Sequence, residues 1–128
     1  HPDMEIILTA KEMTDEFVSS CVKSGNGRVI DASGRSKRLR DLIQMISCAE
    51  LLIAGSTGPL HIASALGKRT IGLYCHRNMN CAKHWGALGP LAVNLEVSKA
   101  YCDTNCSGDK ENCDFEEGIS IQSVLDSI

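Results

Sequence analysis

Short apolar runs and stretches with helical periodicity follow one another along the chain. The apolar runs predict strands over residues 5–8, from Val29 onward, and over residues 51–54, 70–74 and 90–95. Between most of them, apolar residues recur at the three- and four-residue spacing of an amphipathic helix. This alternation predicts an α/β fold, a Rossmann-like parallel sheet with flanking helices.

Residues 51–74, LLIAGSTGPLHIASALGKRTIGLY, form the clearest of these units. The apolar run that ends before Gly55 predicts a strand buried on both faces. Pro59 suits the first turn of a helix, where its missing N–H leaves no bond unmade, and Gly67 suits the left-handed position that follows a helix. The segment therefore predicts a strand, a tight turn, a short helix and a second, parallel strand reached by a right-handed crossover.

The turn of this unit is the candidate binding site. Open parallel sheets bind ligands at the carboxyl ends of their strands, and the N–H groups at a helix N-terminus attract phosphate. The alternative is an ordinary capped helix with Thr57 or Gly58 as N-cap and His61 on the surface. The predicted diphosphate site comprises Ser56, Thr57, Gly58, Pro59, Leu60 and His61.

The other helices are predicted from caps and apolar stripes. Thr9 and Glu12 have the capping-box spacing and would open the first helix. A further helix is predicted over residues 37–49, and a last one, capped by Ser120, would dock on the sheet. The first stripe is Met13, Phe17, Val18, Cys21 and Val22, and the last is Ile121, Val124, Leu125 and Ile128.

Composition places the chain among soluble globular proteins. Its 128 residues are 43% hydrophobic and 23% charged, and the net charge of −3 argues against a general nucleic-acid binder. No apolar run approaches the roughly 20 residues of a membrane span, and there is no secretory signal. We expect one domain over residues 1–128, ending in a cysteine-containing tail and closing helix over 101–128. Because the sequence begins at His1, we expect it to be a piece of a longer protein.

Two groups of basic residues each have two interpretations. The first group stands at the start of the helix predicted over residues 37–49. It is either a solvated helix entrance or a phosphate site, and the first is favoured because runs of charged residues usually face water. The second lies in a loop predicted over residues 75–85, at the same sheet edge as the turn, and would contact phosphate or acceptor, or stay exposed. The first group is Arg35, Lys37, Arg38 and Arg40, and the second is Arg77, Lys83 and His84.

Seven cysteines, without a secretory signal, indicate a reducing compartment and mostly free thiols. Those in predicted helices or strands are expected to be buried. Three others stand in a polar tail at C-x3-C-x6-C spacing, where Cys81 or His84 would complete a zinc site. The paired C-x2-C motifs of a strong site are absent, so we predict no metal. The first set is Cys21, Cys48 and Cys75, and the tail set is Cys102, Cys106 and Cys113.

Residues 51–74 resemble the sugar-nucleotide-binding segment of glycosyltransferase family 9, the ADP-heptose:lipopolysaccharide heptosyltransferases. That family shows a polar or acidic residue, Ser/Thr-Gly-Pro-x-His, an Ala-rich helix, a glycine and another strand. Two departures stand out: Ser56 replaces the usual Asp that is implicated in holding the donor sugar, and Cys75-His76-Arg77 replaces a Gly-Pro-Thr type loop. The matching residues are Ser56, Thr57, Gly58, Pro59, His61, Ala63, Ala65, Leu66 and Gly67.

The resemblance implies the C-terminal half of a two-domain, GT-B type glycosyltransferase. Such an enzyme would bind ADP-heptose, with Lys37 near the nucleotide, and transfer the sugar to a lipopolysaccharide core acceptor. The acceptor and the catalytic base, whose identity is unknown, would belong to the N-terminal domain, so the chain alone is expected to be inactive. The resemblance implies no cofactor, and a cytoplasmic bacterial enzyme with at most peripheral contact with the inner membrane. A sugar-nucleotide epimerase of the same architecture and a non-catalytic nucleotide-binding module are the alternatives.

Overall fold

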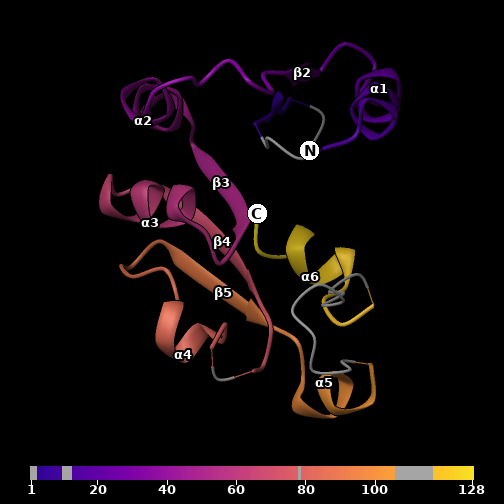
Figure 1. Ribbon diagram of the computed structural model, residues 1–128, viewed down its shortest axis with the longest axis vertical. Helices are drawn as coiled ribbons and strands as arrows, with labels where there is room; N and C mark the ends of the chain where they lie inside the picture. The colour runs from indigo at the N-terminus through magenta and orange to yellow at the C-terminus, as the bar shows by residue number, and fades with distance from the viewer. Residues whose placement is uncertain (1–2, 10–12, 78, 106–116) are drawn as a thin grey trace. The chain divides into compact units, whose positions relative to one another are not determined.

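The computed structural model of the chain describes residues 3–9, 13–77, 79–105 and 117–128. It divides into two compact units, His1–Gln44 and Met45–Ile128, and the division falls within helix α2 (Leu39–Cys48). Each unit contains a parallel sheet accompanied by helices (Figure 1). The α/β class with parallel strands and flanking helices is therefore confirmed. The assignment of residues 1–128 to one domain stays a prediction.

The first unit is built on two strands. Strands β1 (Ile6–Leu8) and β2 (Val29–Asp31) pair in parallel, with Ile6 opposite Val29, and helix α1 (Asp15–Ser24) connects them. No residue of α1 is buried, so the apolar stripe predicted for this helix is only partly covered within the unit. The following helix, α2, lies within the range predicted for it.

Helix α1 begins later than the sequence predicted. Thr14 is its N-cap, and the Thr14 hydroxyl accepts a hydrogen bond of 3.2 Å from the backbone N–H of Phe17. The prediction that Thr9 opens the helix is wrong, because two acidic residues directly after Thr14 also favour a helix start there through the helix dipole. The predicted capping partner, Glu12, lies outside the described residues.

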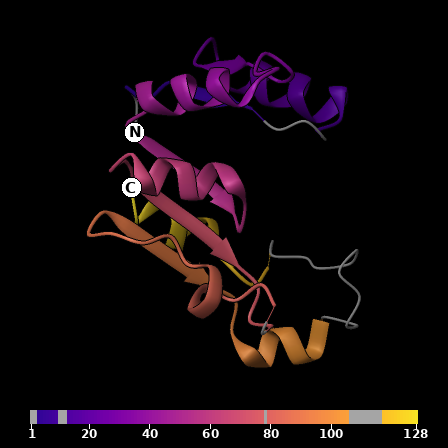
Figure 2. The same ribbon diagram turned by 60° about the vertical axis from the view of Figure 1, so that its left-hand side comes forward.

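The second unit is a three-stranded parallel sheet in the order β3, β4, β5 (Figure 1). The strands are β3 (Leu51–Gly55), β4 (Arg69–Tyr74) and β5 (Ala92–Glu96). Helix α3 (Gly58–Ala65) connects β3 to β4, and the short helix α4 (Ala82–Trp85) follows β4 (Figure 2). The parallel strand–helix–strand order predicted over residues 51–74 is confirmed, but burial of its first strand on both faces is wrong, since Ile53 of β3 is 43% exposed. The prediction of a continuous loop over residues 75–85 is also wrong, because α4 begins at Ala82.

Helix α3 ends as the sequence predicted. Gly67 has a φ of +69°, the left-handed conformation that a residue with a side chain rarely adopts. Its N–H donates to the carbonyl of Ser64 at 3.0 Å, and the N–H of Lys68 donates to the carbonyl of Ala63 at 3.0 Å. These two bonds form a Schellman motif, which satisfies the last carbonyl groups of the helix and returns the chain to the sheet.

The core of the second unit is centred on Tyr74, the last residue of β4. Tyr74, Leu60 of α3 and Ala87 pack together, and all three are buried. The backbone N–H of Ala87 donates to the Tyr74 hydroxyl at 3.0 Å, so the buried oxygen has a partner. Burial raises the pKa of Tyr74, and the bond from Ala87 opposes that shift.

Helix α5 (Lys99–Asn105) lies where the sequence predicted the start of a polar tail. It buries Cys102, whose Sγ lies 3.5 Å from the Sγ of Cys75 at the end of β4. The tail prediction is therefore wrong for Cys102, because packing against Cys75 removes this apolar side chain from water. Cys106 and Cys113 lie outside the described residues.

The three cysteines predicted to be buried differ in their surroundings. Cys75 is buried as predicted, Cys21 is partly exposed, and Cys48 is exposed. The prediction of burial was wrong for Cys48. This residue ends α2 two positions after the buried Ile46, and residues two apart lie on different sides of a helix.

The C-terminal helix, α6 (Ile121–Leu125), has the cap that was predicted. The backbone N–H of Ser123 donates to the Ser120 hydroxyl at 3.1 Å. The apolar stripe is less buried than predicted, since the Ile121 side chain is 79% exposed. The guanidinium of Arg69, at the start of β4, donates to the carbonyl of Ile128 and thereby ties the C-terminus to the sheet.

Gly72→Ala should lower the free energy of unfolding by about 1–3 kcal/mol, the usual range for overpacking a core. An added Cβ would lie 2.5 Å from Cε2 of Tyr74, whose buried ring cannot move away without breaking its contacts. Gly55→Ala is the matched control, because its Cβ would meet only the Leu73 carbonyl, at 3.8 Å. Urea unfolding of both variants measures the difference, and equal losses would contradict the steric explanation.

Candidate functional site

The carboxyl ends of β3, β4 and β5 meet at one edge of the sheet. Gly55, which ends β3, pairs with Leu73, and Tyr74, which ends β4, pairs with Glu96, which ends β5. The turn before α3, the loop after β4 and the Glu96 side chain therefore belong to the same edge. Ligands of open parallel sheets bind at this edge.

The turn between β3 and α3 has a helix start whose polar groups are only partly used. Thr57 is the N-cap, with φ −138° and ψ 161°, but its side chain makes no capping hydrogen bond. Pro59 has no N–H, and the N–H of Leu60 donates to the Thr57 carbonyl at 3.2 Å. Thr57 thus occupies the position that the capped-helix alternative gave it, while its exposed hydroxyl stays available to a ligand.

Gly58 gives an approaching ligand direct access to the backbone. A Cβ built on this exposed residue would meet no atom within 4 Å, so the space beside it is open. Its N–H is the remaining first-turn donor, since Pro59 has none and the N–H of Leu60 is engaged. The positive end of the α3 dipole lies at the same place, and it favours an anion.

The predicted site residues after Gly58 have separate tasks. Leu60 is fully buried in the core cluster, so only its backbone is near the turn and its side chain holds α3 on the sheet. His61 is partly buried, and its ring lies 6.3 Å, centroid to centroid, from the ring of Trp85 at the end of α4. Sequence reasoning did not single out Trp85, because no local pattern places it beside α3.

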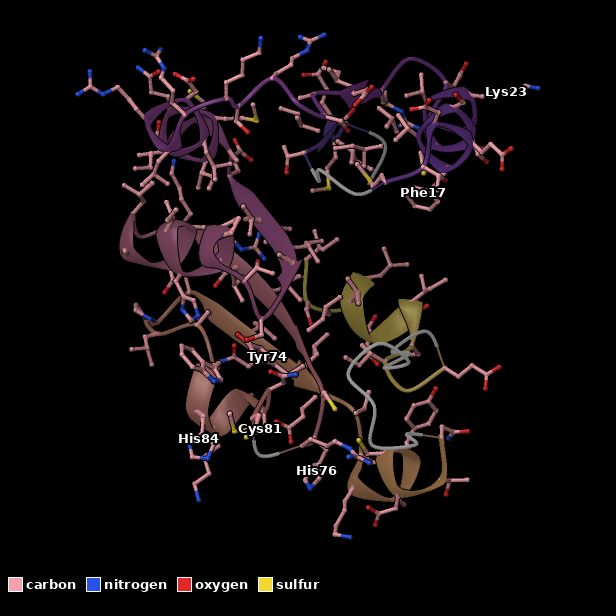
Figure 3. The ribbon with its side chains drawn as sticks, viewed as in Figure 1. Phe17, Lys23, Tyr74, His76, Cys81 and His84 are labelled. Carbon is pink, nitrogen blue, oxygen red and sulfur yellow. The ribbon has the colours of Figure 1, made fainter. Side chains whose placement is uncertain are left out.

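A second polar arrangement lies at the ends of β4 and β5. The Nδ1 atom of His76 lies 2.8 Å from one carboxylate oxygen of Glu96, and the other oxygen accepts a 2.7 Å bond from the backbone N–H of Ala82. Glu96 therefore neutralises the N-terminus of α4 and holds the loop that follows β4. Figure 3 shows His76 at the end of β4, and Cys81 and His84 on the α4 segment. Sequence reasoning missed Glu96, whose only local signal was an acidic residue ending a strand.

The basic residues predicted between positions 75 and 85 lie on the surface. Arg77, Lys83 and His84 are exposed. The ammonium group of Lys99 lowers the pKa of Asp103 through a hydrogen bond and its charge, and the charges of His76 and Arg77 lower it further. Arg77 is thus close enough to Asp103, on α5, for its charge to act there.

The basic residues before α2 belong to the first unit. Arg38 forms an ion pair of 3.0 Å with Asp41, and its backbone N–H donates to the same carboxylate at 3.2 Å. These bonds make Arg38 part of the helix entrance, as one of the two interpretations predicted. Lys37 is exposed in the connection between β2 and α2, and its contact with a nucleotide stays a prediction.

The described part of the chain contains no group of three or more His, Cys, Asp or Glu side chains that could hold a metal ion. Within the same residues, no helix is long and apolar enough to cross a membrane.

A family model described as "Glycosyltransferase family 9 (heptosyltransferase)" matches residues 6–117. The chain belongs to glycosyltransferase family 9. A Haemophilus influenzae protein with the name "Putative glycosyltransferase" is 29% identical over 126 residues, which are 98% of this chain and 34% of that protein. The family 9 chain thus spans about a third of the length of this curated relative. No solved structure matches the chain.

Glu96→Ala should destabilise this family 9 chain more than His76→Ala does. The Glu96 change removes two hydrogen bonds to a charged acceptor, each of which contributes about 1.5–3 kcal/mol, whereas the His76 change removes one of them. Thermal melts give the order of stability, and hydrogen exchange at the Ala82 amide should accelerate only in the Glu96 variant. Unchanged exchange at Ala82 would show that the carboxylate does not hold the start of α4.

Proposed function

We propose that this chain is the donor-binding half of a glycosyltransferase, the C-terminal domain of a GT-B type enzyme. The donor would be ADP-heptose and the acceptor a lipopolysaccharide core. The observation that supports the proposal is the turn before α3, at the carboxyl edge of the parallel sheet of this family 9 chain. There the Thr57 hydroxyl makes no capping hydrogen bond, and the backbone of Gly58 is open to a ligand.

The chemistry that this turn would supply is electrostatic. When the bond between the sugar and the diphosphate breaks, negative charge develops on the leaving nucleoside diphosphate. The Gly58 N–H, the Thr57 O–H and the positive end of the α3 dipole would stabilise that charge, since they are already oriented before the reaction. Ser56, in place of the usual Asp, would offer the sugar a neutral hydroxyl instead of a carboxylate.

Other parts of the enzyme would complete the site. Lys37 would contact the nucleotide, and the catalytic base and the acceptor site would come from the N-terminal domain. The proposed chemistry uses no cofactor, and the enzyme would work in the cytoplasm with at most peripheral contact with the inner membrane. A glycosylated acceptor, as opposed to an isomerised nucleotide-sugar, is the product that separates transfer from the epimerase alternative.

Thr57→Ala should weaken ADP binding while leaving stability unchanged. A hydrogen bond from a hydroxyl to a charged phosphate contributes about 1.5–3 kcal/mol, so the dissociation constant should rise by roughly 10- to 150-fold. Stability should stay constant because the Thr57 side chain makes no capping bond. Calorimetric titration with ADP and thermal melts measure both effects, and Thr57→Ser, which keeps the hydroxyl, is the control. A lower melting temperature with unchanged ADP affinity would support the capped-helix alternative.

Gly58→Val should reduce ADP affinity more than Thr57→Ala. The branched side chain would fill the open space through which phosphate approaches the backbone, and its Cβ would meet no protein atom within 4 Å. Gly58→Ala is the graded control and should have a smaller effect. The same titrations decide the order, and unchanged affinity in the valine variant would count strongly against a phosphate site at this turn.

A further inference from the structure

We propose that Trp85 is the platform for the glycosyl group of the donor, with one face of its indole ring stacked against the sugar. This inference rests on the proposed function, which places the diphosphate at Gly58. It adds a residue on a different helix, α4, and a different kind of contact, apolar instead of electrostatic.

The position of Trp85 follows from the parallel sheet. Helices α3 and α4 each follow a strand, so both start at the carboxyl edge, and His61 and Trp85 are the fourth residues of their helices. Their ring centroids are 6.3 Å apart and their planes are inclined at 59°. With a rise of about 1.5 Å per residue, His61 lies roughly one turn from Gly58, which places the indole on the order of 10 Å from the proposed phosphate position.

Polar contacts one turn further on hold the two segments together. The N–H of Leu88 donates to the Ser64 hydroxyl at 3.1 Å, and that hydroxyl donates to the carbonyl of Leu88. Ser64 follows His61 by three residues and lies on the same side of α3, and Leu88 follows Trp85 by three residues. These contacts hold the segment that carries Trp85 beside α3.

The indole is a suitable surface for a sugar. Trp85 is 53% exposed. A single exposed apolar residue is ordinary by itself, and what distinguishes Trp85 is its position beside His61 in the first turn and a half of α3. The face of an indole is electron-rich, and the C–H groups on one side of a sugar ring are apolar with slightly positive hydrogens, so the two surfaces are complementary.

The sugar fits this position better than the nucleobase does. The nucleoside and the glycosyl group leave the diphosphate from opposite ends, and the ribose separates the nucleobase from the first phosphate. A sugar bonded directly to the second phosphate can reach the indole, because one ring width and one van der Waals contact together approach the estimated separation. The indole is thus assigned to the glycosyl end.

Trp85 is the only tryptophan of the chain, so its fluorescence reports on this position alone. We expect ADP-heptose to change the emission of the chain, and inorganic pyrophosphate and ADP to leave it nearly constant. Trp85→Ala should weaken ADP-heptose binding about fivefold to tenfold and leave ADP binding unchanged, as expected for the loss of one aromatic contact. Leu88→Ala is the matched control, because its side chain is 81% exposed on the neighbouring segment and should change neither affinity.

Each other outcome has a definite meaning. Equal losses of ADP and ADP-heptose affinity in Trp85→Ala would place the nucleoside on the indole and overturn the assignment. Unchanged affinity for both would reduce Trp85 to a packing residue. No binding of any of the three ligands by the unmodified chain would overturn the diphosphate site and this inference with it. Trp85→Leu keeps apolar bulk without the aromatic face, and it should reproduce the result if the alanine variant does not fold.

Discussion

The burial of Tyr74 is the constraint on which the second unit depends. The ring fills the space between the sheet and Leu60 of α3, and the hydroxyl accepts a hydrogen bond from Ala87, beyond α4. One side chain at the end of β4 thereby joins three segments. Displacing it would shift α3, and with α3 the turn that carries Thr57 and Gly58.

The parallel arrangement then brings two helix starts to the same edge, and the protein treats them differently. At α4, the carboxylate of Glu96 accepts a hydrogen bond from the N–H of Ala82, so a negative group of the protein already lies at the positive end of the helix. At α3, no side chain of the turn caps the helix, and the backbone beside Gly58 is open. A bound anion could accept hydrogen bonds at the start of α3, whereas at α4 the Glu96 carboxylate already does so. For this reason the proposed diphosphate site is the turn before α3.

Local signals in the sequence determined much of the second unit. The apolar runs, Pro59 in the first turn of α3 and Gly67 after its end act within a few residues, through backbone geometry and local hydrogen bonds. The strand–turn–helix–strand order and the position of Thr57 at the helix start were therefore predictable. The motif that joins them also carried the family resemblance, because its residues stand in one short stretch. The capping-box spacing of Thr9 did not find the start of α1, which the structure places at Thr14.

Only the tertiary structure decided which distant side chains meet. His76 and Glu96 are twenty residues apart in sequence, and Cys75 and Cys102 are twenty-seven apart, yet each pair is in contact. Such contacts arise because parallel pairing brings together the ends of separate strands and the segments that follow them, and neither periodicity nor spacing within one segment records that pairing. The same reason explains why Trp85, unremarkable in sequence, lies beside His61. The turn before α3 was predictable from its own residues, whereas the side chains around it are brought there only by the folded sheet.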